Sequence, residues 1–513
     1  MRFLRAVGLL LVVAAVVGLV LWVPDAAPPG QAALDRPDIP TALEEGSPSA
    51  SWYCAASTIG TPEPPRHEVV MTNAGAAVAS VRLTPFGEGA PAGVEVVEVP
   101  AGSATSVDLA ALFGVAPLSV VAESAAPALA VEHRLSDPTS ADQVPCATVT
   151  SDSWWFPALN SARGSTALLT LFNPFPSDAG VDVEVVLDAS ARTPAELSGI
   201  VIPPRSVKVV DVGAVVQRRD VFAVVVRSRS GRVVAEATQR FDGSAAPRGL
   251  RMNIGVADTS SRWVFAGGFT GTGALETLVV VNPSTERVSA EVRVTPYGGA
   301  STAPEPIVLE IPPLRYGLVD LSAESRVPPL GYHSVTVETD DVPVAAALLA
   351  TITGPPAPVD PAAQPAGTTP PAQRPALGSG VAISTGSPAA AGAWLVPALD
   401  GGSTPAPVVF VHNPFDTPTV VSVVPVDAGL DAAALAEATT EVEVPARDSV
   451  ALTVPAAVTP GQPVGLRLSA MAPVVVERLV TYPEQDELAK GSAVPLRSPR
   501  SGPVGLPPLR PGG

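Results

Sequence analysis

The chain has 513 residues, of which 46% are hydrophobic, 16% are charged and only 4% are aromatic. Its formal net charge of −18 argues against a nucleic-acid-binding surface, because an acidic protein repels phosphates and no basic stripe interrupts the sequence. Valine and alanine supply most of the apolar mass, and 59 prolines and 43 glycines favour many short strands over long helices.

The N-terminus carries a targeting signal. Arg2 and Arg5 precede an uninterrupted apolar run over residues 6–23, long enough for about 27 Å of helix, close to the thickness of a bilayer. Basic residues favour the cytoplasmic side. We therefore predict a cytoplasmic stub at 1–5, a single-pass signal-anchor at 6–23 in the plasma membrane and an extracytoplasmic body. Secretion after signal cleavage is the alternative.

A spacer and one disulfide are expected next. Residues 24–50 are rich in Pro, Ala and Gly without an apolar period, which is typical of a disordered spacer. Cys54 and Cys146 are the only cysteines, and two thiols in an exported chain most simply form one disulfide.

Four landmarks then recur in the same order in four copies, which indicates an internal repeat. A tryptophan opens each copy: Trp52, Trp154, Trp263 and Trp394. An asparagine follows 19 to 21 residues later: Asn73, Asn173, Asn282 and Asn413. An apolar residue before a proline comes next: Val99-Pro100, Ile202-Pro203, Ile311-Pro312 and Val444-Pro445. Eight residues after each of these prolines stand Asp108, Asp211, Asp320 and Thr453.

Within each copy the pattern predicts about seven short strands. Residues 181–185 alternate apolar and charged side chains, whereas 168–172 are almost wholly apolar and suit an inner strand. Residues 222–227 and 233–239 read as a closing apolar hairpin. We predict an all-β fold of four tandem immunoglobulin-like β-sandwiches behind the transmembrane helix. A β-propeller with two blades per repeat is the alternative.

The expected domains follow from these landmarks, namely β-sandwich repeats at 51–148, 149–257, 258–353 and 381–489, a Pro-rich linker at 354–380 and a disordered tail at 490–513. An extended, semi-stiff linker suits separate modules better than a closed ring. Residues 430–437 of the fourth copy look like a short inserted helix.

The sequence offers no catalytic, cofactor or metal-binding motif. Four histidines (His67, His133, His333 and His412) fall at different places in the repeat, and no zinc or EF-hand spacing is present. The recurring aspartates close strands, where capping of the next turn is their ordinary role. The glycine-rich run 267–273 precedes no helix and reads as a loop.

Aromatic side chains give one candidate for recognition. The recurrence of the opening tryptophan favours a core role for it, but Trp155, Phe156 and Phe175 are distinctive to the second copy. Exposed aromatics anchor partners and stack on sugar rings, so these three residues are the predicted partner contact.

With its repeated tryptophan, Asn-Pro, apolar-Pro and Asp landmarks behind an anchor, the chain resembles an actinobacterial family of exported proteins, domain of unknown function 5719. The likeness covers most of residues 50–485. It implies an envelope-facing protein and supplies no catalytic residue.

These features predict a membrane-anchored extracytoplasmic protein that is not an enzyme. Its expected partners are cell-wall glycan or an envelope protein, with no nucleic acid. A glycan-acting hydrolase with acids from adjacent repeats and a passive stalk are the alternatives.

Overall fold

The structure is a computed structural model, and the chain divides into two compact units, Met1–Asp35 and Arg36–Gly513. It describes residues 40–42, 50–56, 65–87, 93–114, 119–244, 247–271, 273–297, 304–352, 380–398, 408–427, 429–453, 465–482, 487–492, 494–495 and 504–506, all in the second unit. The predicted stub, the anchor at 6–23 and most of the spacer and linker lie outside the described residues.

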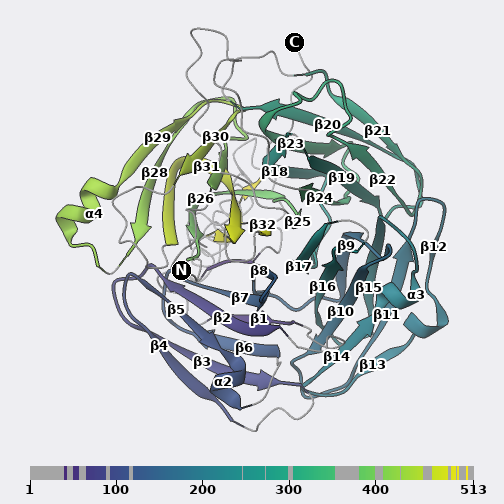
Figure 1. The fold of residues 1–513 in the computed structure, drawn as a ribbon, viewed down its shortest axis with the longest axis horizontal. Coiled ribbons are helices and arrows are strands. Elements are labelled where there is room, and N and C mark those ends of the chain that lie inside the picture. Colours follow the sequence, from purple (N-terminus) through teal and green to yellow (C-terminus); the bar gives the residue numbers. More distant parts are fainter. Residues whose placement is uncertain are drawn as a thin grey trace, which may run out of the picture. The chain divides into compact units, whose positions relative to one another are not determined.

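The second unit is all-β with a few short helices, which confirms the predicted class (Figure 1). Its α-helices are α2 (Leu109–Phe113), α3 (Val212–Val215) and α4 (Ala432–Ala438). Helix α4 lies where the inserted helix was expected, and Asp431 caps its first turn. Within the described residues, every helix falls short of the length and apolarity needed to cross a membrane.

The first copy builds two antiparallel four-stranded sheets. The Trp sheet, named for the strand that holds Trp52, has the order β1 (Ala50–Cys54), β6 (Ser119–Ser124), β3 (Ala79–Phe86), β4 (Glu95–Val99). The Asn sheet, named for the strand that ends on Asn73, has the order β5 (Ser103–Asp108), β2 (Arg66–Asn73), β7 (Leu129–Asp137), β8 (Ser140–Pro145). One hydrophobic cluster, which includes Trp52, Val69 and Val81, joins the two sheets.

The second and third copies repeat this order. The second copy's Trp sheet contains β9 (Ser153–Leu159), β15 (Phe222–Ser230), β11 (Ala179–Val186), β12 (Ala191–Arg192) and β13 (Ile200–Ile202). Its Asn sheet contains β14 (Ser206–Asp211), β10 (Ser165–Asn173), β16 (Val234–Asp242) and β17 (Arg248–Ile254). The third copy's Trp sheet contains β18 (Arg262–Thr270), β23 (Gly331–Thr339), β20 (Val288–Pro296) and β21 (Ile307–Ile311). Its Asn sheet contains β22 (Arg315–Asp320), β19 (Ala274–Asn282), β24 (Ala345–Ile352) and β25 (Gly380–Ser384).

In the fourth copy one long strand serves both sheets. The first half of β31 (Gly465–Tyr482) pairs with β26 (Ala389–Val396) and β28 (Thr419–Val426), and β28 pairs with β29 (Thr440–Val444). The second half pairs with β27 (Val408–His412) and β32 (Glu487–Ser492), and β27 pairs with β30 (Ser449–Thr453).

The predicted closing hairpin was wrong. The two apolar segments of the second copy are β15 and β16, and they pair with strands of different sheets, β9 and β11 for one and β10 and β17 for the other. Both strands are apolar because each is interior to its sheet. That pattern carries no information on whether consecutive strands pair with each other.

The third copy is completed by residues beyond the Pro-rich stretch. Strand β25 begins at Gly380 and pairs with β24 over Leu348–Ile352, although the sequence places 381 at the start of the fourth repeat. Beyond Lys490, where a disordered tail is predicted, the structure describes β33 (Val494–Pro495) and β34 (Val504–Gly505), both paired with β26.

The alternation predicted in the second copy is confirmed. Along β11, Val181, Val183 and Val185 are fully buried in the core while Asp182 and Glu184 are half-buried. The period of two directs every second side chain to the same face of the strand, so this strand needs only one apolar face.

Each landmark asparagine joins its own turn to the apolar-proline step. In the third copy, Asn282 Nδ2 donates to the carbonyl oxygens of Glu286 and Ile311 at 2.7 and 3.1 Å. It also donates to the carbonyl of Pro312 at 3.1 Å, and Asn282 Oδ1 accepts from the backbone N–H of Ser284 at 2.8 Å. The same four contacts recur in the other three copies. The spacing between these two landmarks is therefore a hydrogen-bonding constraint.

The landmark tryptophans are core residues, at most 2% exposed. In the last three copies the indole N–H donates to a backbone carbonyl just before β16, just before β24 or midway along β31: Val233, Val344 and Val474. In the first copy Trp52 donates instead to Thr41 O, at 3.3 Å.

We predict that Asn282→Ala lowers the free energy of unfolding by about 2–4 kcal/mol, because it leaves buried carbonyl groups without their donor. Urea unfolding followed by circular dichroism would measure it. Glu310→Ala, at an exposed position next to Ile311, is the control. Equal effects of the two substitutions would contradict the proposed role of the carboxamide.

Candidate functional site

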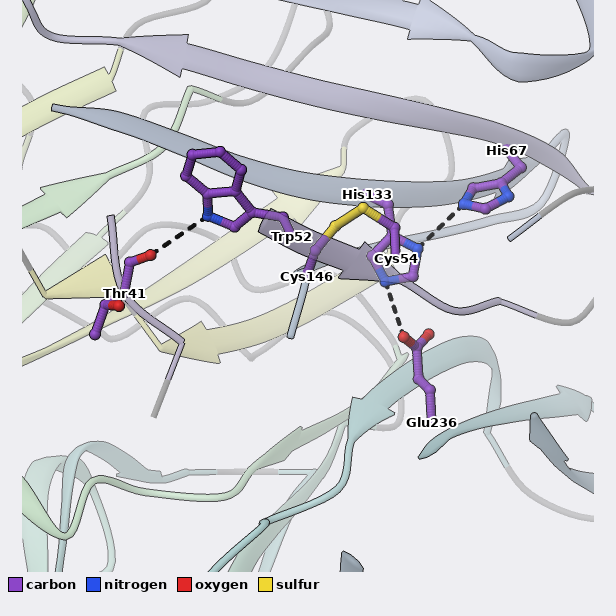
Figure 2. Close-up of a disulfide and its surroundings, with 7 residues drawn as sticks. All are labelled: Thr41, Trp52, Cys54, His67, His133, Cys146 and Glu236. Carbon is purple, nitrogen blue, oxygen red and sulfur yellow. Dashed lines mark hydrogen bonds and ion pairs between the residues drawn. A yellow bond between two sulfur atoms is a disulfide. The ribbon is translucent and has the colours of Figure 1, made fainter. Parts of the chain in front are cut away.

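The predicted disulfide is confirmed. Cys54, at the end of β1, is bonded to Cys146, which directly follows β8, and both are buried (Figure 2). The bond joins the first strand of the first copy to its last, so it closes this copy covalently.

The three aromatic residues predicted to contact a partner lie in different environments. Phe156 is fully buried in the core of the second copy, and Trp155 is 6% exposed, so neither presents a surface to a partner. Phe175, in the turn after Asn173, is 37% exposed. Of the three predicted contact residues, Phe175 alone is accessible.

Trp155 marks a position that packs against the next copy. Trp155 clusters with Val281 and Ala345 of the third copy. The equivalent Tyr53 of the first copy meets Phe172 of the second edge to face, with ring centroids 6.3 Å apart. Val264 of the third copy and Leu395 of the fourth lie in the corresponding clusters with the fourth and first copies. The residue after the landmark tryptophan is thus a contact between copies.

A buried glutamate recurs at three of these contacts. It is the residue that pairs with the third position before the landmark asparagine: Glu132 on β7, Glu236 on β16 and Glu477 on β31. All three are fully buried. In the third copy the same register position is Ala347.

Between the first and second copies, a buried acid lies beside two buried histidines (Figure 2). His133 Nε2 lies 3.0 Å from Glu236 Oε2, and His67 Nε2 lies 3.1 Å from His133 Nδ1. Burial lowers the pKa of His133 to about 3, with Glu132 acting in the opposite sense, and burial raises the pKa of Glu236 well above its usual value. Burial therefore disfavours the charged form of both groups at this contact. The sequence placed His67 and His133 at unrelated positions, but the pairing of β2 with β7 brings them together.

Asp142 reinforces the same contact. Its Oδ2 accepts from the backbone N–H of Met252 in the second copy at 2.6 Å. Burial raises the pKa of Asp142 to about 7; the hydrogen bonds from the backbone of Met252 and Gln143 and the charge of Arg478 oppose the rise, and Glu236 adds to it.

Between the fourth and first copies the glutamate is paired with an arginine. Arg478 Nη2 donates to Glu132 Oε2 at 2.6 Å, with both side chains at most 1% exposed. Gln143 Nε2 donates to the same oxygen at 2.6 Å and to Ala398 O at 3.1 Å. Ala398 N in turn donates to Thr72 Oγ1 of the first copy at 3.0 Å. These contacts attach the last copy to the first.

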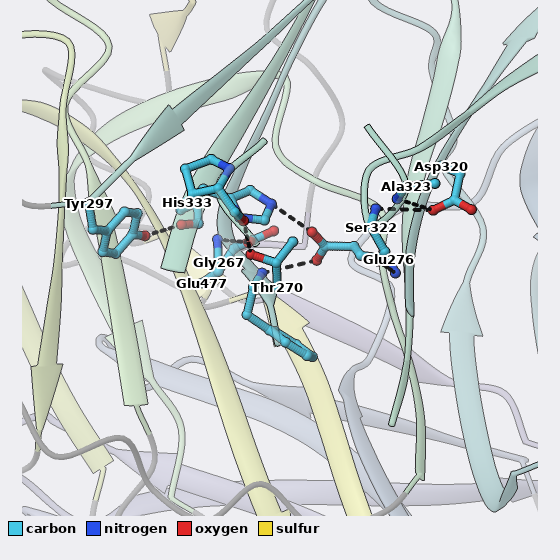
Figure 3. Close-up of polar contacts among 12 residues, drawn as sticks. Gly267, Thr270, Glu276, Tyr297, Asp320, Ser322, Ala323, His333 and Glu477 are labelled. Atoms are coloured by element: carbon cyan, nitrogen blue, oxygen red, sulfur yellow. Dashed lines mark hydrogen bonds and ion pairs between the residues drawn. The ribbon is translucent and has the colours of Figure 1, made fainter. Parts of the chain in front are cut away.

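Between the third and fourth copies the glutamate accepts from the backbone (Figure 3). Gly267 N donates to Glu477 Oε2 at 2.7 Å, and Ser384 Oγ donates to Glu477 Oε1. A Cβ at Gly267 would lie 2.3 Å from the ring of Phe410, so only glycine allows this approach. Much of the glycine-rich run is therefore strand β18, not the loop that the sequence indicated.

A buried histidine and a buried glutamate of the third copy, His333 and Glu276, lie within ion-pair distance of each other. His333 Nε2 is 2.7 Å from Glu276 Oε2, and Glu276 Oε1 accepts from Phe269 N at 3.3 Å (Figure 3). Asp320 Oδ1 accepts from the backbone N–H groups of Ser322 and Ala323 at 3.0 and 3.1 Å. The second set confirms the capping role predicted for the recurring aspartate.

Between the second and third copies the contact is apolar and a pocket opens. Ala347 packs with Ala158 of the second copy and Ile383 of β25. Farther along the same face of β24, Leu349 and Thr351 line a pocket of about 1200 Å³. Its second-copy wall includes the arginines Arg163, Arg218 and Arg251. This pocket is the strongest candidate for a ligand site.

The four contacts form a closed series. Strand β8 packs beside β17, β17 beside β25, β25 beside β32, and β32 beside β8 (Figure 1). The expectation that the linker separates the fourth copy as an independent module is therefore wrong, because buried polar side chains hold that copy to both neighbours.

One pair of buried acids from adjacent copies, Asp142 and Glu236, differs from a two-carboxylate catalytic pair. Asp142 and Glu236 come from adjacent copies, but both are buried and the pKa of each is raised, so they lack opposed environments and access to substrate. Asp220 is the one acid among the described residues that line the pocket. Within the described residues, potential metal ligands do not gather in groups of three or more.

We predict that Asp142→Asn flattens the pH dependence of stability. The folded-state pKa lies above the ordinary 3.8, so the wild type's added stability is full below pH 3.8 and is lost as pH rises to about 7. The free energy of unfolding of the wild type, relative to that of the variant, should fall by roughly 3–4 kcal/mol over that pH range. Urea unfolding at a series of pH values would measure it, with exposed Asp178→Asn as control. Parallel wild-type and Asp142→Asn curves would exclude this titration.

Comparisons with known proteins bear on family and not on activity. Curated proteins give no significant match. Among solved structures, one match is the crystal structure of Thermotoga maritima 1070. The two sequences are 21% identical, and the match covers 19% of this chain and 84% of the Thermotoga maritima chain. The TM-score of this match is 0.17. The model of a family of unknown function, DUF5719, matches residues 137–387, which confirms over those residues the family resemblance drawn from the repeated landmarks.

Proposed function

We propose that this protein is a membrane-anchored, extracytoplasmic scaffold that binds cell-wall glycan or an envelope protein and is not an enzyme. Four immunoglobulin-like β-sandwich modules would stand behind a transmembrane anchor at residues 6–23. The two sheets that share one core in the first copy, and their recurrence in the others, support the module assignment.

One observation carries the proposal: buried polar contacts fix the modules to one another. Arg478 and Glu132 lie 346 residues apart in sequence and form a hydrogen-bonded ion pair inside the protein. Loss of one partner from such a buried pair costs about 3–5 kcal/mol, because the other charge is left uncompensated. Modules held in this way present their surfaces in fixed register, as a scaffold requires and a flexible string of domains does not.

The disulfide supports an extracytoplasmic location. Both cysteines of the chain are used in the bond between Cys54 and Cys146. Disulfides persist in oxidising compartments and are rare in the cytosol of mesophiles. Export also agrees with the apolar run that follows Arg2 and Arg5 in the sequence.

The first experiment is crosslinking of the intact protein in the membrane of its own cell, followed by mass spectrometry of the adducts. We expect envelope glycan or protein adducts from the wild type and from Arg467→Ala, an exposed position on β31. Arg478→Ala should reduce the adducts several-fold, because it loosens the join between the fourth and first copies.

The outcomes separate the alternatives. Absence of adducts from the wild type would favour a passive stalk. Release of soluble products from envelope glycan by the purified protein would overturn the non-enzymatic assignment and favour a hydrolase. The mass of the mature chain would distinguish an anchor from a cleaved signal.

A further inference from the structure

We propose that the pocket between the second and third copies binds a small ligand through an oxyanion, either a carboxylate or a phosphate, on an apolar or sugar framework. This site is independent of the envelope role proposed above. The cavity, of about 1200 Å³, is large enough for a small organic molecule.

Charge is the first reason. Three arginines and one aspartate are the ionic residues among the described lining, so the pocket carries a formal charge of 3 − 1 = +2 in a chain of −18. Arginine presents paired N–H groups that match the geometry of carboxylate and phosphate oxygens. A local excess of arginine in so acidic a protein selects for anionic ligands.

Arg251 is a built element of the site. It is 3% exposed, its guanidinium lies over the ring of Phe241 at 5.2 Å, and its Nε donates to Gln239 Oε1 at 2.7 Å. The described residues supply no hydrogen-bond acceptor for Nη1, the remaining nitrogen of this otherwise anchored group. Burial lowers the pKa of Arg251 to about 9, while Asp142 opposes that shift, so it remains a cation at neutral pH. A fixed cation that lines a pocket is a preorganised partner for an oxyanion.

The other two arginines lie on loops that are joined to each other. Arg218 N donates to Ser161 O at 3.0 Å, and Ser161 N donates to Arg219 O at 2.8 Å. Arg163 and Arg218 are exposed, and among the described residues hydrogen bonds lower the pKa of Asp242 and the charge of Arg163 helps to lower it further. Their loops are thus held in place while their guanidinium groups stay available.

The opposite wall of the pocket is uncharged and mainly apolar, with Thr277 and Thr351 among its leucine and valine side chains. Leu275, Leu349 and Val381 come from three strands of the third copy's Asn sheet, and Leu275 is 57% exposed. Asn160 and Gln217 add amide groups from the second copy. One cationic wall and one mainly apolar wall, with amides between them, suit a ligand that has an acidic end and a less polar body.

The repeat itself explains why a pocket opens at this contact. Between the first and second copies, the row of side chains on β16 that faces the first copy is Glu236, Thr238 and Arg240, and Arg240 forms an ion pair with Asp137. Between the second and third copies the equivalent row is Ala347, Leu349 and Thr351. Ala347 and Thr351 are smaller than Glu236 and Arg240 and carry no charge, so they leave the space that the ion pair of Arg240 fills between the first and second copies.

Calorimetric titration of the full-length protein in detergent at low salt would test the site with glucuronate, inorganic phosphate and glucose. We expect saturable binding of glucuronate, phosphate or both, and none of glucose. Which anion binds distinguishes a sugar acid from a phosphate as the source of the oxyanion. Glucose binding equal to glucuronate binding, or no binding of either anion, would overturn the proposal.

Variants locate the binding. The double substitution Arg163→Gln and Arg218→Gln should raise the dissociation constant at least tenfold. The variant should stay folded, because both side chains are exposed. Thr351→Arg, which copies Arg240, should also block the pocket. Arg232→Gln is the matched control, since it lies beyond Ser230, at the far end of β15 from the pocket residue Val221. Unchanged affinity in the double variant would place the anion elsewhere and overturn the assignment.

Discussion

The carboxamide of the landmark asparagine is the interaction on which each copy depends. Its two N–H protons and its oxygen join the turn after one strand of the Asn sheet to the proline step at the end of a Trp-sheet strand. A buried amide so fully satisfied is specific, since any other side chain would leave carbonyl groups unpaired. The register of the two sheets, and with it the face that each copy presents to its neighbour, follows from this one side chain.

With this register, the Asn sheet is buried on both faces: one face packs against the copy's own core and the other against a neighbouring copy. In the second copy, Leu169 and Leu171 pack into the copy's own core, and Phe172 packs against Tyr53 and Phe86 of the first copy. Strands covered on both sides need no polar face, which is why these segments are almost wholly apolar. On this face, a buried acid such as Glu132 accepts a hydrogen bond from a donor that the neighbouring copy supplies.

The sequence was enough to predict the all-β class, the repeat, the disulfide and the core position of Trp154, because each leaves a local or periodic signal. It did not predict that β15 and β16 belong to different sheets, since pairing partners are distant in sequence. The contacts of Glu236 and Trp155 were also missed, because they depend on how one copy faces the next. The recurrence of glutamate at 132, 236 and 477 was a visible signal that the landmarks did not include.

Strand β25 has a further consequence for how the chain is made. The third copy's Asn sheet stays one strand short until Gly380–Ser384 has been synthesised, well after Ile352, the end of its neighbour β24. A chain severed anywhere between these two strands would give two fragments, each holding part of the same sheet, that complement each other across the break. The strands on either side of the Pro-rich stretch, β24 and β25, therefore belong to one folding unit.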